Sequence, residues 1–313
     1  MKEIKKCNLC SSEKISKKFL LKDRLHAIDG KFSLFVCNKC GLIFQNPQLS
    51  EKELAPYYPR DYIAYNKGKS PRDKMIDSLY RVYYSNNDYP LLKILFLPVK
   101  SLIRSMPYKK EAKYLDIGCG DASFLKFVKE RGMIPHGVDP FLKNPVSKLN
   151  IKNVSLHNAK YPIEFFDFIT LNNVLEHVQN PLKILTECER ILRKDGKIFV
   201  NVPNSSSLNY HLFSSNWVSL DAPRHLYTFS NKTLSMYGKK CGLLINKINY
   251  KSEPFTILSS IIYAVNKILY RKNKLEGNKL IANRMVNILI LPLSLLLNFL
   301  KIGDQTEIVY VKK

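Results

Sequence analysis

Short apolar runs alternate with segments of helical periodicity through the middle of the chain. The runs have the length of buried strands, and the segments between them repeat their apolar residues every three to four positions. Strands that alternate with helices form a mostly parallel sheet covered by helices, so we expect an α/β fold. The predicted strands are Tyr114–Ile117, Ile134–Val138, Phe165–Leu171 and Lys197–Val202, and the predicted helices are Ser123–Arg131 and Pro181–Leu192, with a turn at Asp195-Gly196.

Further elements continue this alternation. A short strand near Asn153–Leu156, and a helix between it and Asp139, fit the same pattern. Ser230 is a typical N-cap residue for a helix that runs to Cys241 and ends at Gly242. We therefore expect strands and helices to alternate up to the end of that helix.

Two strand-like segments near the C-terminus, Leu243–Tyr250 and Thr306–Val311, are separated by an insertion, residues 251–304. The insertion holds two segments rich in Leu and Ile, Phe255–Tyr270 and Met285–Leu300. As a helix the second segment would be about 24 Å long, short of the roughly 30 Å hydrocarbon core of a bilayer. Basic residues at both of its ends suit a helix that lies on a membrane surface. We expect peripheral membrane contact through residues 285–300, and the alternative is a helical lid on the sheet or on a second subunit.

The stretch from Asp116 to Asp139 has the layout of a nucleoside-cofactor site. Gly118-Cys119-Gly120 is a tight turn between a strand and a helix, and Asp139 ends the next strand. Glycines let a ligand approach the backbone, and a helix N-terminus offers free N–H groups. Ser123 replaces the third glycine of a dinucleotide fingerprint, whereas Asp116 supplies a carboxylate that suits a cofactor with an α-amino group. Asp139 can accept hydrogen bonds from both ribose hydroxyls.

This loop resembles the first motif of the class I S-adenosylmethionine (SAM) methyltransferases, acid-x-Gly-x-Gly. The later phrases FDFITLNNVLEHVQNP and LRKDGKIFVNVPN are similar to members of that family that methylate small molecules such as quinones and sugars. The resemblance covers roughly Lys113–Tyr250. It implies a Rossmann-like fold with a seven-stranded, mostly parallel sheet that ends in a β-hairpin. It also implies SAM binding by Asp116, Gly118, Cys119, Gly120, Asp139, Pro140, Asn158 and Asn172, although family members more often carry an Asp near position 158.

Two C-x-x-C pairs lie near the N-terminus, one formed by Cys7 and Cys10 and the other by Cys37 and Cys40. Four thiolates at this spacing can supply a tetrahedral zinc site, and a hairpin through Phe32–Val36 would bring the two pairs together. A site with four protein ligands is closed, so the zinc would be structural and not catalytic. We therefore expect a zinc ribbon in residues 1–50, and the alternative is two unrelated surface pairs.

Residues 51–105 separate the ribbon from the α/β region. Tyrosines at positions 57, 58, 62 and 65 are interleaved with prolines, which suits either a packed linker or one wall of a substrate pocket. The segment Tyr80–Arg104 contains an apolar run that is too short to span a bilayer, so we expect helices that cap the cofactor domain or lie on a membrane. The chain then divides into a ribbon, a Tyr-rich linker with capping helices, and a methyltransferase domain in residues 106–313.

The segment LDAPRHLYTFS, residues 220–230, follows the fifth predicted strand, where substrate loops lie in this fold. It resembles a segment of zinc-ribbon-bearing sugar methyltransferases of polysaccharide biosynthesis, in which a histidine can serve as the base. His225 is our candidate for that catalytic role because the ordinary histidine pKa, near 6.5, suits proton removal at neutral pH. The alternative is that His225 orders the loop. Glu176-His177 is a second candidate acid–base pair, although such pairs at a helix start more often pack and cap.

Composition limits the class of protein without naming its partner. The 313 residues suggest one large or two modest domains, and an apolar content of 45% is ample for a buried core. Seven cysteines with no secretory signal peptide argue against a disulfide framework, so we expect a cytoplasmic protein. The formal net charge of +24 implies an anionic partner or, alternatively, a lysine-biased, AT-rich genome.

The sequence thus predicts a SAM-dependent methyltransferase that acts on a small-molecule or glycosyl acceptor, such as a nucleotide- or lipid-linked sugar in surface-polysaccharide synthesis. The alternative is an RNA methyltransferase that uses the ribbon to bind nucleic acid. Enzymes that methylate base amino groups usually carry an Asn/Asp-Pro-Pro-aromatic motif, whereas this chain has Asn172-Asn-Val-Leu, so we do not expect a nucleic-acid partner. A non-catalytic SAM-binding or membrane-scaffold protein is disfavoured by the intact loop acids and glycines.

Overall fold

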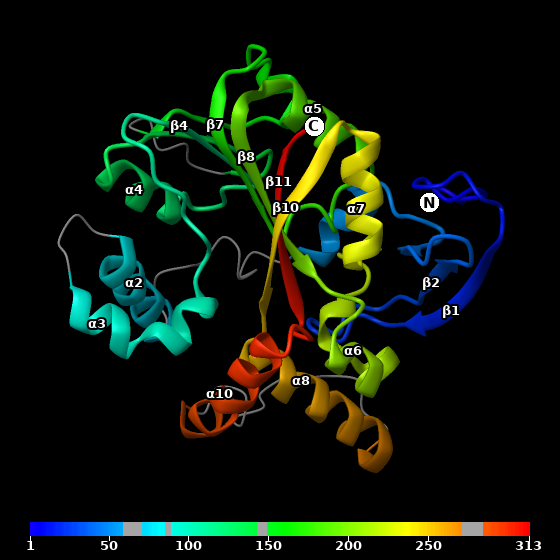
Figure 1. Cartoon of the computed structure of the whole chain (residues 1–313). Coiled ribbons are helices and arrows are strands. Elements are labelled where there is room, and N and C mark those ends of the chain that lie inside the picture. The colour runs from blue at the N-terminus through cyan, green and yellow to red at the C-terminus, as the bar shows by residue number, and fades with distance from the viewer. Residues whose placement is uncertain (59–70, 85–88, 143–148, 271–283) are drawn as a thin grey trace.

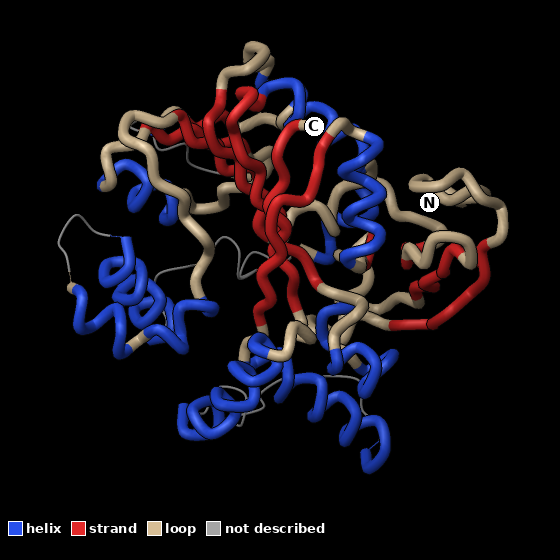
Figure 2. Tube along the Cα trace, viewed as in Figure 1, coloured by secondary structure: helices blue, strands red, loops and turns tan. Residues whose placement is uncertain are grey.

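The computed structural model describes residues 1–58, 71–84, 89–142, 149–270 and 284–313 (Figure 1). The predicted helix after Asp139 and the tyrosines at positions 62 and 65 fall outside, or mostly outside, these described residues. Figure 2 shows a central twisted sheet with helices around it and a smaller sheet beside the N-terminus. The position of the candidate site follows from how these two sheets are joined.

The central sheet has seven strands in the order β10-β11-β8-β7-β4-β5-β6. Neighbouring strands from β8 to β6 are parallel, and β11 runs antiparallel to both β8 and β10. This topology confirms the predicted seven-stranded, mostly parallel α/β sheet with a C-terminal hairpin. The strands are β4 (Lys113–Ile117), β5 (Ile134–Val138), β6 (Ile151–Lys152), β7 (Phe166–Asn172), β8 (Leu192–Pro203), β10 (Leu243–Lys251) and β11 (Gln305–Lys312).

Two predicted boundaries are wrong. The edge strand is β6 at Ile151–Lys152, and the predicted segment Asn153–Leu156 lies outside it. The side-chain amide of Asn153 instead donates to the carbonyl of Leu142, in the segment that follows β5, at 2.8 Å. The expected turn at Asp195-Gly196 lies within β8, where it shows as a break in the pairing of β8 with β7 between Leu192 and Lys197.

Helices pack on both faces of the sheet, and side-chain caps mark the starts of two of them, of which the Ser230 cap was predicted. The side chain of Asn180 accepts a hydrogen bond from the amide of Lys183 at the start of α5. Ser230 and Thr233 form a capping box at the start of α7. These helices are α4 (Ser123–Glu130), α5 (Pro181–Ile191) and α7 (Asn231–Lys240), with α6 (Leu208–Phe213) and the 3-10 turns η5 (His157–Ala159), η6 (Ser214–Asn216) and η7 (Val218–Leu220) in the connections.

The segment between ribbon and sheet contributes helices that cover α4. Tyr80 stacks on Phe127 with ring centres 5.2 Å apart and meets Phe124 edge-on at 5.6 Å. This apolar contact fits the predicted capping role for part of residues 51–105. The elements are α1 (Glu51–Leu54), η1 (Ala55–Tyr57), α2 (Pro71–Tyr84), α3 (Pro90–Leu95) and η3 (Leu97–Leu102).

The insertion forms two helices beyond the carboxyl end of β8, α8 (Pro254–Val265, continued by the π-helical turn Asn266–Tyr270) and α10 (Arg284–Phe299) (Figure 1). Buried Asp304 ties this region together, because its carboxylate accepts hydrogen bonds from Trp217, Asn209 and Thr256 at 2.7–2.9 Å. Among the helices that the structure describes, none combines the length and apolarity needed to cross a membrane.

The smaller sheet joins the ribbon to the α/β domain. Its strands are β1 (Ile15–Leu21), β2 (Phe32–Cys37), β3 (Ile43–Gln45) and β9 (Tyr227–Thr228), all paired antiparallel in that order. The hairpin predicted through Phe32–Val36 is present as β1 and β2. The fourth strand, β9, belongs to the loop that follows β8, so the candidate substrate loop forms the edge strand of the ribbon sheet.

Candidate active site

The glycine loop after β4 has a backbone that only glycine adopts easily. Gly118 has φ +67° and Gly120 has φ +54°, both in the left-handed region. A Cβ atom at Gly118 would also lie 2.5 Å from the side chain of Val174. Both glycines of the predicted motif are therefore required by the turn itself, before any ligand is considered.

Asp139, at the end of β5, points its carboxylate at this loop. One oxygen accepts a hydrogen bond from the Gly120 amide and the other from the Phe141 amide, each at 2.9 Å, and the side chain is almost fully buried. An ionised carboxylate has about four lone-pair sites, so two acceptor positions remain for ribose hydroxyls. The geometry fits the predicted role of this acid.

Asp116 is buried and already partnered. Its Oδ1 accepts from the hydroxyl of Thr170 at 2.7 Å, and its Oδ2 lies 3.2 Å from the guanidinium of Arg104. The guanidinium also lies over the ring of Phe124, 4.9 Å from its centre. Sequence reasoning missed Arg104, which places a positive charge beside the loop that is expected to take the carboxylate end of a cofactor.

The remaining predicted cofactor residues differ in burial. The buried side chain of Cys119 packs against the backbone of Gly137, and Asn172 at the end of β7 accepts a hydrogen bond from the amide of Asn201 at 3.3 Å. Pro140 and Asn158 are exposed. Asn158 lies in η5, and within the described residues no hydrogen bond joins its side chain to the glycine loop, so its role stays a prediction.

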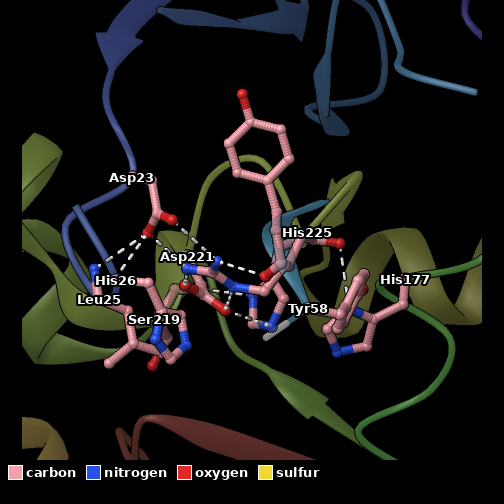
Figure 3. Close-up of polar contacts among 10 residues, drawn as sticks. Asp23, Leu25, His26, Tyr58, His177, Ser219, Asp221 and His225 are labelled. Carbon is pink, nitrogen blue, oxygen red and sulfur yellow. Dashed lines mark hydrogen bonds and ion pairs between the residues drawn. The ribbon is translucent and has the colours of Figure 1, made fainter. Parts of the chain in front are cut away.

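His225 is held in one tautomer within the loop after η7 (Figure 3). Its Nδ1 lies 2.8 Å from the carbonyl of Ser219, and since a carbonyl only accepts, Nδ1 carries the proton. Nε2 is therefore an acceptor, and it lies 4.0 Å from Asp221 Oδ2. Burial lowers the pKa of His225 below 6.5, although Asp221 opposes this effect. At neutral pH the imidazole is neutral and can take a proton.

Glu176 and His177 lie beside His225, in the turn between β7 and α5. The two imidazole rings meet edge-on with centres 4.7 Å apart, and Nδ1 of His177 lies 3.0 Å from the carbonyl of Arg224. Neither carboxylate oxygen of the fully buried Glu176 has a hydrogen-bond partner among the described residues, and burial raises the pKa of Glu176 to about 8. One ligand atom from each of these three residues lies within 4.8 Å of the others, so this cluster is able to hold a metal ion.

A buried arginine fixes the loop that carries His225. The side chain of Arg224 has no exposure, and its guanidinium binds both carboxylate oxygens of Asp23 at 2.8 and 3.1 Å. It also binds Asp221 through two hydrogen bonds and donates to the carbonyl of Tyr57. The hydroxyl of Tyr58 lies 3.2 Å from Nδ1 of His177. Figure 3 shows these groups converging from the ribbon, the linker and the loop.

The predicted metal ligands, Cys7, Cys10, Cys37 and Cys40, form one cluster. The sulfurs of Cys7 and Cys40 are 3.6 Å apart and those of Cys10 and Cys37 are 3.5 Å apart. A tetrahedral site with zinc–sulfur bonds of about 2.3 Å needs sulfurs roughly 3.8 Å apart, so the cluster fits zinc after a small relaxation. Asn8, between the first two cysteines, bonds Tyr227 and Tyr237 of the α/β domain at 2.6 and 2.8 Å, which docks this knuckle beside β9.

Comparison with a family model for a methyltransferase domain gives a match over residues 92–246. An uncharacterised protein of Methanocaldococcus jannaschii is 28% identical over 189 residues, which are 60% of this chain and 83% of that protein. The ubiquinone biosynthesis O-methyltransferase of Glaesserella parasuis is 29% identical over 115 residues, 32% of this chain. The match to this second protein spans about half of its length, 49%.

Solved structures align with this chain at low TM-scores and low sequence identity. A SAM-dependent methyltransferase from Archaeoglobus fulgidus aligns with a TM-score of 0.43 and 22% identity, covering 76% of this chain and 99% of that one. A protein from Galdieria sulphuraria, described as a sarcosine dimethylglycine methyltransferase, aligns with a TM-score of 0.44 and 14% identity. The alignment covers 79% of this chain and 91% of that one.

Proposed function

We propose that the protein, whose residues 92–246 match a family model for a methyltransferase domain, transfers the methyl group of SAM to a hydroxyl group of a small-molecule or glycosyl acceptor. The main support for this proposal is the state of His225, a buried neutral imidazole whose Nε2 is an acceptor beside Asp221. The O-methyltransferases among the relatives support an oxygen acceptor. A nucleotide- or lipid-linked sugar is the glycosyl acceptor that we propose.

The glycine loop and its two acids would hold SAM, which supplies an activated methyl group when bound. Gly118 and Gly120 leave room for the ligand next to the backbone, and Asp139 offers two acceptor sites to the ribose. Arg104 would pair with the carboxylate of the methionine part, while Asp116 would fix Arg104 and meet the ammonium group. Cys119, Pro140, Asn158 and Asn172 remain proposed contacts of the same site.

His225 would act as the general base. As the acceptor oxygen takes the methyl group and the methyl–sulfur bond breaks, Nε2 takes the hydroxyl proton. The Ser219 carbonyl holds the proton on Nδ1 and keeps Nε2 available. Asp221, 4.0 Å from Nε2, would then stabilise the imidazolium ion that forms. S-adenosylhomocysteine is the second product.

We propose a structural role for zinc, bound by the four cysteines at the N-terminus. The buried apolar side chains of residues 1–58 belong to one cluster shared with the α/β domain, so the metal would add folding energy that is local to the ribbon. The ribbon in turn carries Asp23, which binds Arg224 next to His225. Zinc would therefore act on the reaction only through the position of this loop.

The test is methyl transfer from SAM to a panel of nucleotide-sugars, lipid-linked sugars and catechols, with His225→Gln beside the native protein. General bases contribute typically 10²–10⁴-fold, so we expect kcat to fall by about that factor with SAM affinity unchanged. The matched control is His211→Gln, which changes an exposed histidine on α6. Full turnover by His225→Gln would show that His225 is not the base. If the protein bound SAM but transferred no methyl group to any acceptor in the panel, the proposed activity would be refuted.

The pH dependence gives a second readout in the same assay. Protonation of Nε2 abolishes the base, and the pKa of His225 is lowered below 6.5 by burial. Activity should therefore persist as pH falls from 7 through 6.5 and decline only at lower pH. An acid limb centred above 6.5 would contradict the role of this buried imidazole.

A further inference from the structure

A basic hollow lies where the ribbon meets the insertion, between β1, η6 and the end of α8. Its volume is about 190 Å³, far above the roughly 15 Å³ that one water molecule needs. Four cationic side chains line it: Lys22, Arg24, Lys31 and Lys267. Among the described residues that line it, none is acidic. A hollow with this lining suits a compact anion.

The cations around the hollow are not neutralised by the described part of the chain. None of the four forms an ion pair with a described residue, and the three lysines are exposed at its rim. Arg24 is held further in, where it donates to the side-chain oxygen of Asn216 at 3.3 Å. Its guanidinium lies 5.2 Å from the ring centre of Tyr263. Like charges gathered in this way repel one another, and a bound anion would relieve that repulsion.

The acid next to Arg24 in sequence is committed elsewhere. Asp23 points the opposite way, and both of its oxygens bind the guanidinium of Arg224. It also accepts from the backbone amides of Leu25 and His26. The tight turn after β1 therefore separates two adjacent charges, with the carboxylate directed into the buried cluster and the guanidinium directed into the hollow.

The hollow continues toward the proposed base. A second, smaller cavity shares Lys22, Arg24 and Tyr263 with it and is also lined by Asp221. The carboxylate of Asp221 lies 4.0 Å from Nε2 of His225. This second cavity measures about 20 Å³, room for about one water molecule, so a molecule that joined the hollow to the base would have to widen it.

We propose that this hollow binds the phosphoryl or diphosphoryl group of the acceptor. A guanidinium and three ammonium groups match the several oxygens of a phosphate ester, and the guanidinium can bind two of them at once. The attachment of that phosphate to the methylated molecule rests on the proposed function, whereas phosphate binding itself does not. A soluble nucleotide-linked molecule and a lipid-linked one share this chemistry.

The experiment measures binding of inorganic pyrophosphate to the full chain by calorimetry at low ionic strength. The test variant is the double substitution Lys31→Ala/Lys267→Ala, which removes two exposed rim charges and spares the packed Arg24. The matched control is Lys194→Ala/Lys240→Ala, which removes two exposed lysines that do not line the hollow. We expect saturable binding that weakens at least tenfold in the test variant and stays unchanged in the control.

A second arm separates the two sources of phosphate. Vesicles of phosphatidylcholine containing phosphatidic acid are compared with vesicles of phosphatidylcholine alone, in both double variants. Binding to the acidic vesicles that requires Lys31 and Lys267 indicates a lipid-linked phosphate. Binding of pyrophosphate with no binding to the acidic vesicles indicates a soluble phosphate. Absence of binding in both arms, or equal binding by both double variants, overturns the proposal. Because neither arm needs SAM, a failure of methyl transfer would leave this result interpretable.

Discussion

The cofactor part and the acceptor part of the candidate site are built in opposite ways. The cofactor part is nearly continuous in sequence, with Asp116, the glycine loop and Asp139 on one strand–helix–strand unit. The acceptor part brings together the ribbon, the linker, the turn after β7 and the loop after η7. Asp23 and Arg224, its central ion pair, are 201 positions apart in the chain.

This difference predicts different sensitivities. The strand–helix–strand unit of the cofactor part forms when its own two strands pair. Substitutions far from this unit should therefore leave SAM binding nearly intact. The acceptor part depends on the docking of the ribbon, since β9 joins the ribbon sheet and Arg224 is buried between the two. Damage to the ribbon should therefore remove methyl transfer while sparing cofactor affinity.

The largest effect is expected from the cysteine cluster. Cys40→Ser should abolish stoichiometric zinc, loosen the ribbon and lower methyl transfer at least about 100-fold, because structural zinc contributes of order 10 kcal/mol to folding of such modules. SAM affinity, measured by calorimetry, should change less than about threefold. Cys241→Ser, at a buried cysteine outside the cluster, is the control. If Cys40→Ser lowered SAM affinity by the same factor as methyl transfer, the cofactor part and the acceptor part would not be independent of each other.

The next effect concerns the buried ion pair. Arg224→Met leaves Asp23 and Asp221 without their shared cation and should lower the free energy of unfolding by about 3–5 kcal/mol. The exposed pair Lys6–Glu13 supplies the control: Lys6→Met should cost at most about 1 kcal/mol. Chemical denaturation of both variants measures the difference. Equal losses in the two variants would show that burial of the Arg224 cluster has no energetic consequence.

The smallest effect is expected in the cofactor part. Asp139→Ala removes two charge-assisted acceptor sites for the ribose and should weaken SAM binding by about 10–100-fold, or roughly 1.4–2.8 kcal/mol. The unfolding midpoint of the variant checks that it is still folded, because the same carboxylate also accepts hydrogen bonds from two backbone amides. Unaltered SAM affinity in a folded Asp139→Ala protein would refute the assigned cofactor site.

Local patterns predicted most of the sheet and its helices. β5 has the bounds read from its apolar run, and Ser230 caps α7 as expected. The edge strand was misplaced because Ile151–Lys152 and Asn153–Leu156 have similar apolar content, and the choice between them depends on pairing with β5. Arg104 was missed because its contacts with Asp116 and Phe124 appear in no local pattern.

The sequence alone determined the α/β fold, the glycine loop with its two acids, and the four cysteines, because each of these depends on residues close together in the chain. Only the tertiary structure decided which residues surround His225. It placed His177 beside the imidazole and committed Asp23 to Arg224. It also buried Glu176, whose carboxylate has no hydrogen-bond partner in the part of the chain that the structure describes. The physical reason is that such contacts arise from packing distant segments into one core, where burial and pairing select the neighbours that local spacing cannot encode.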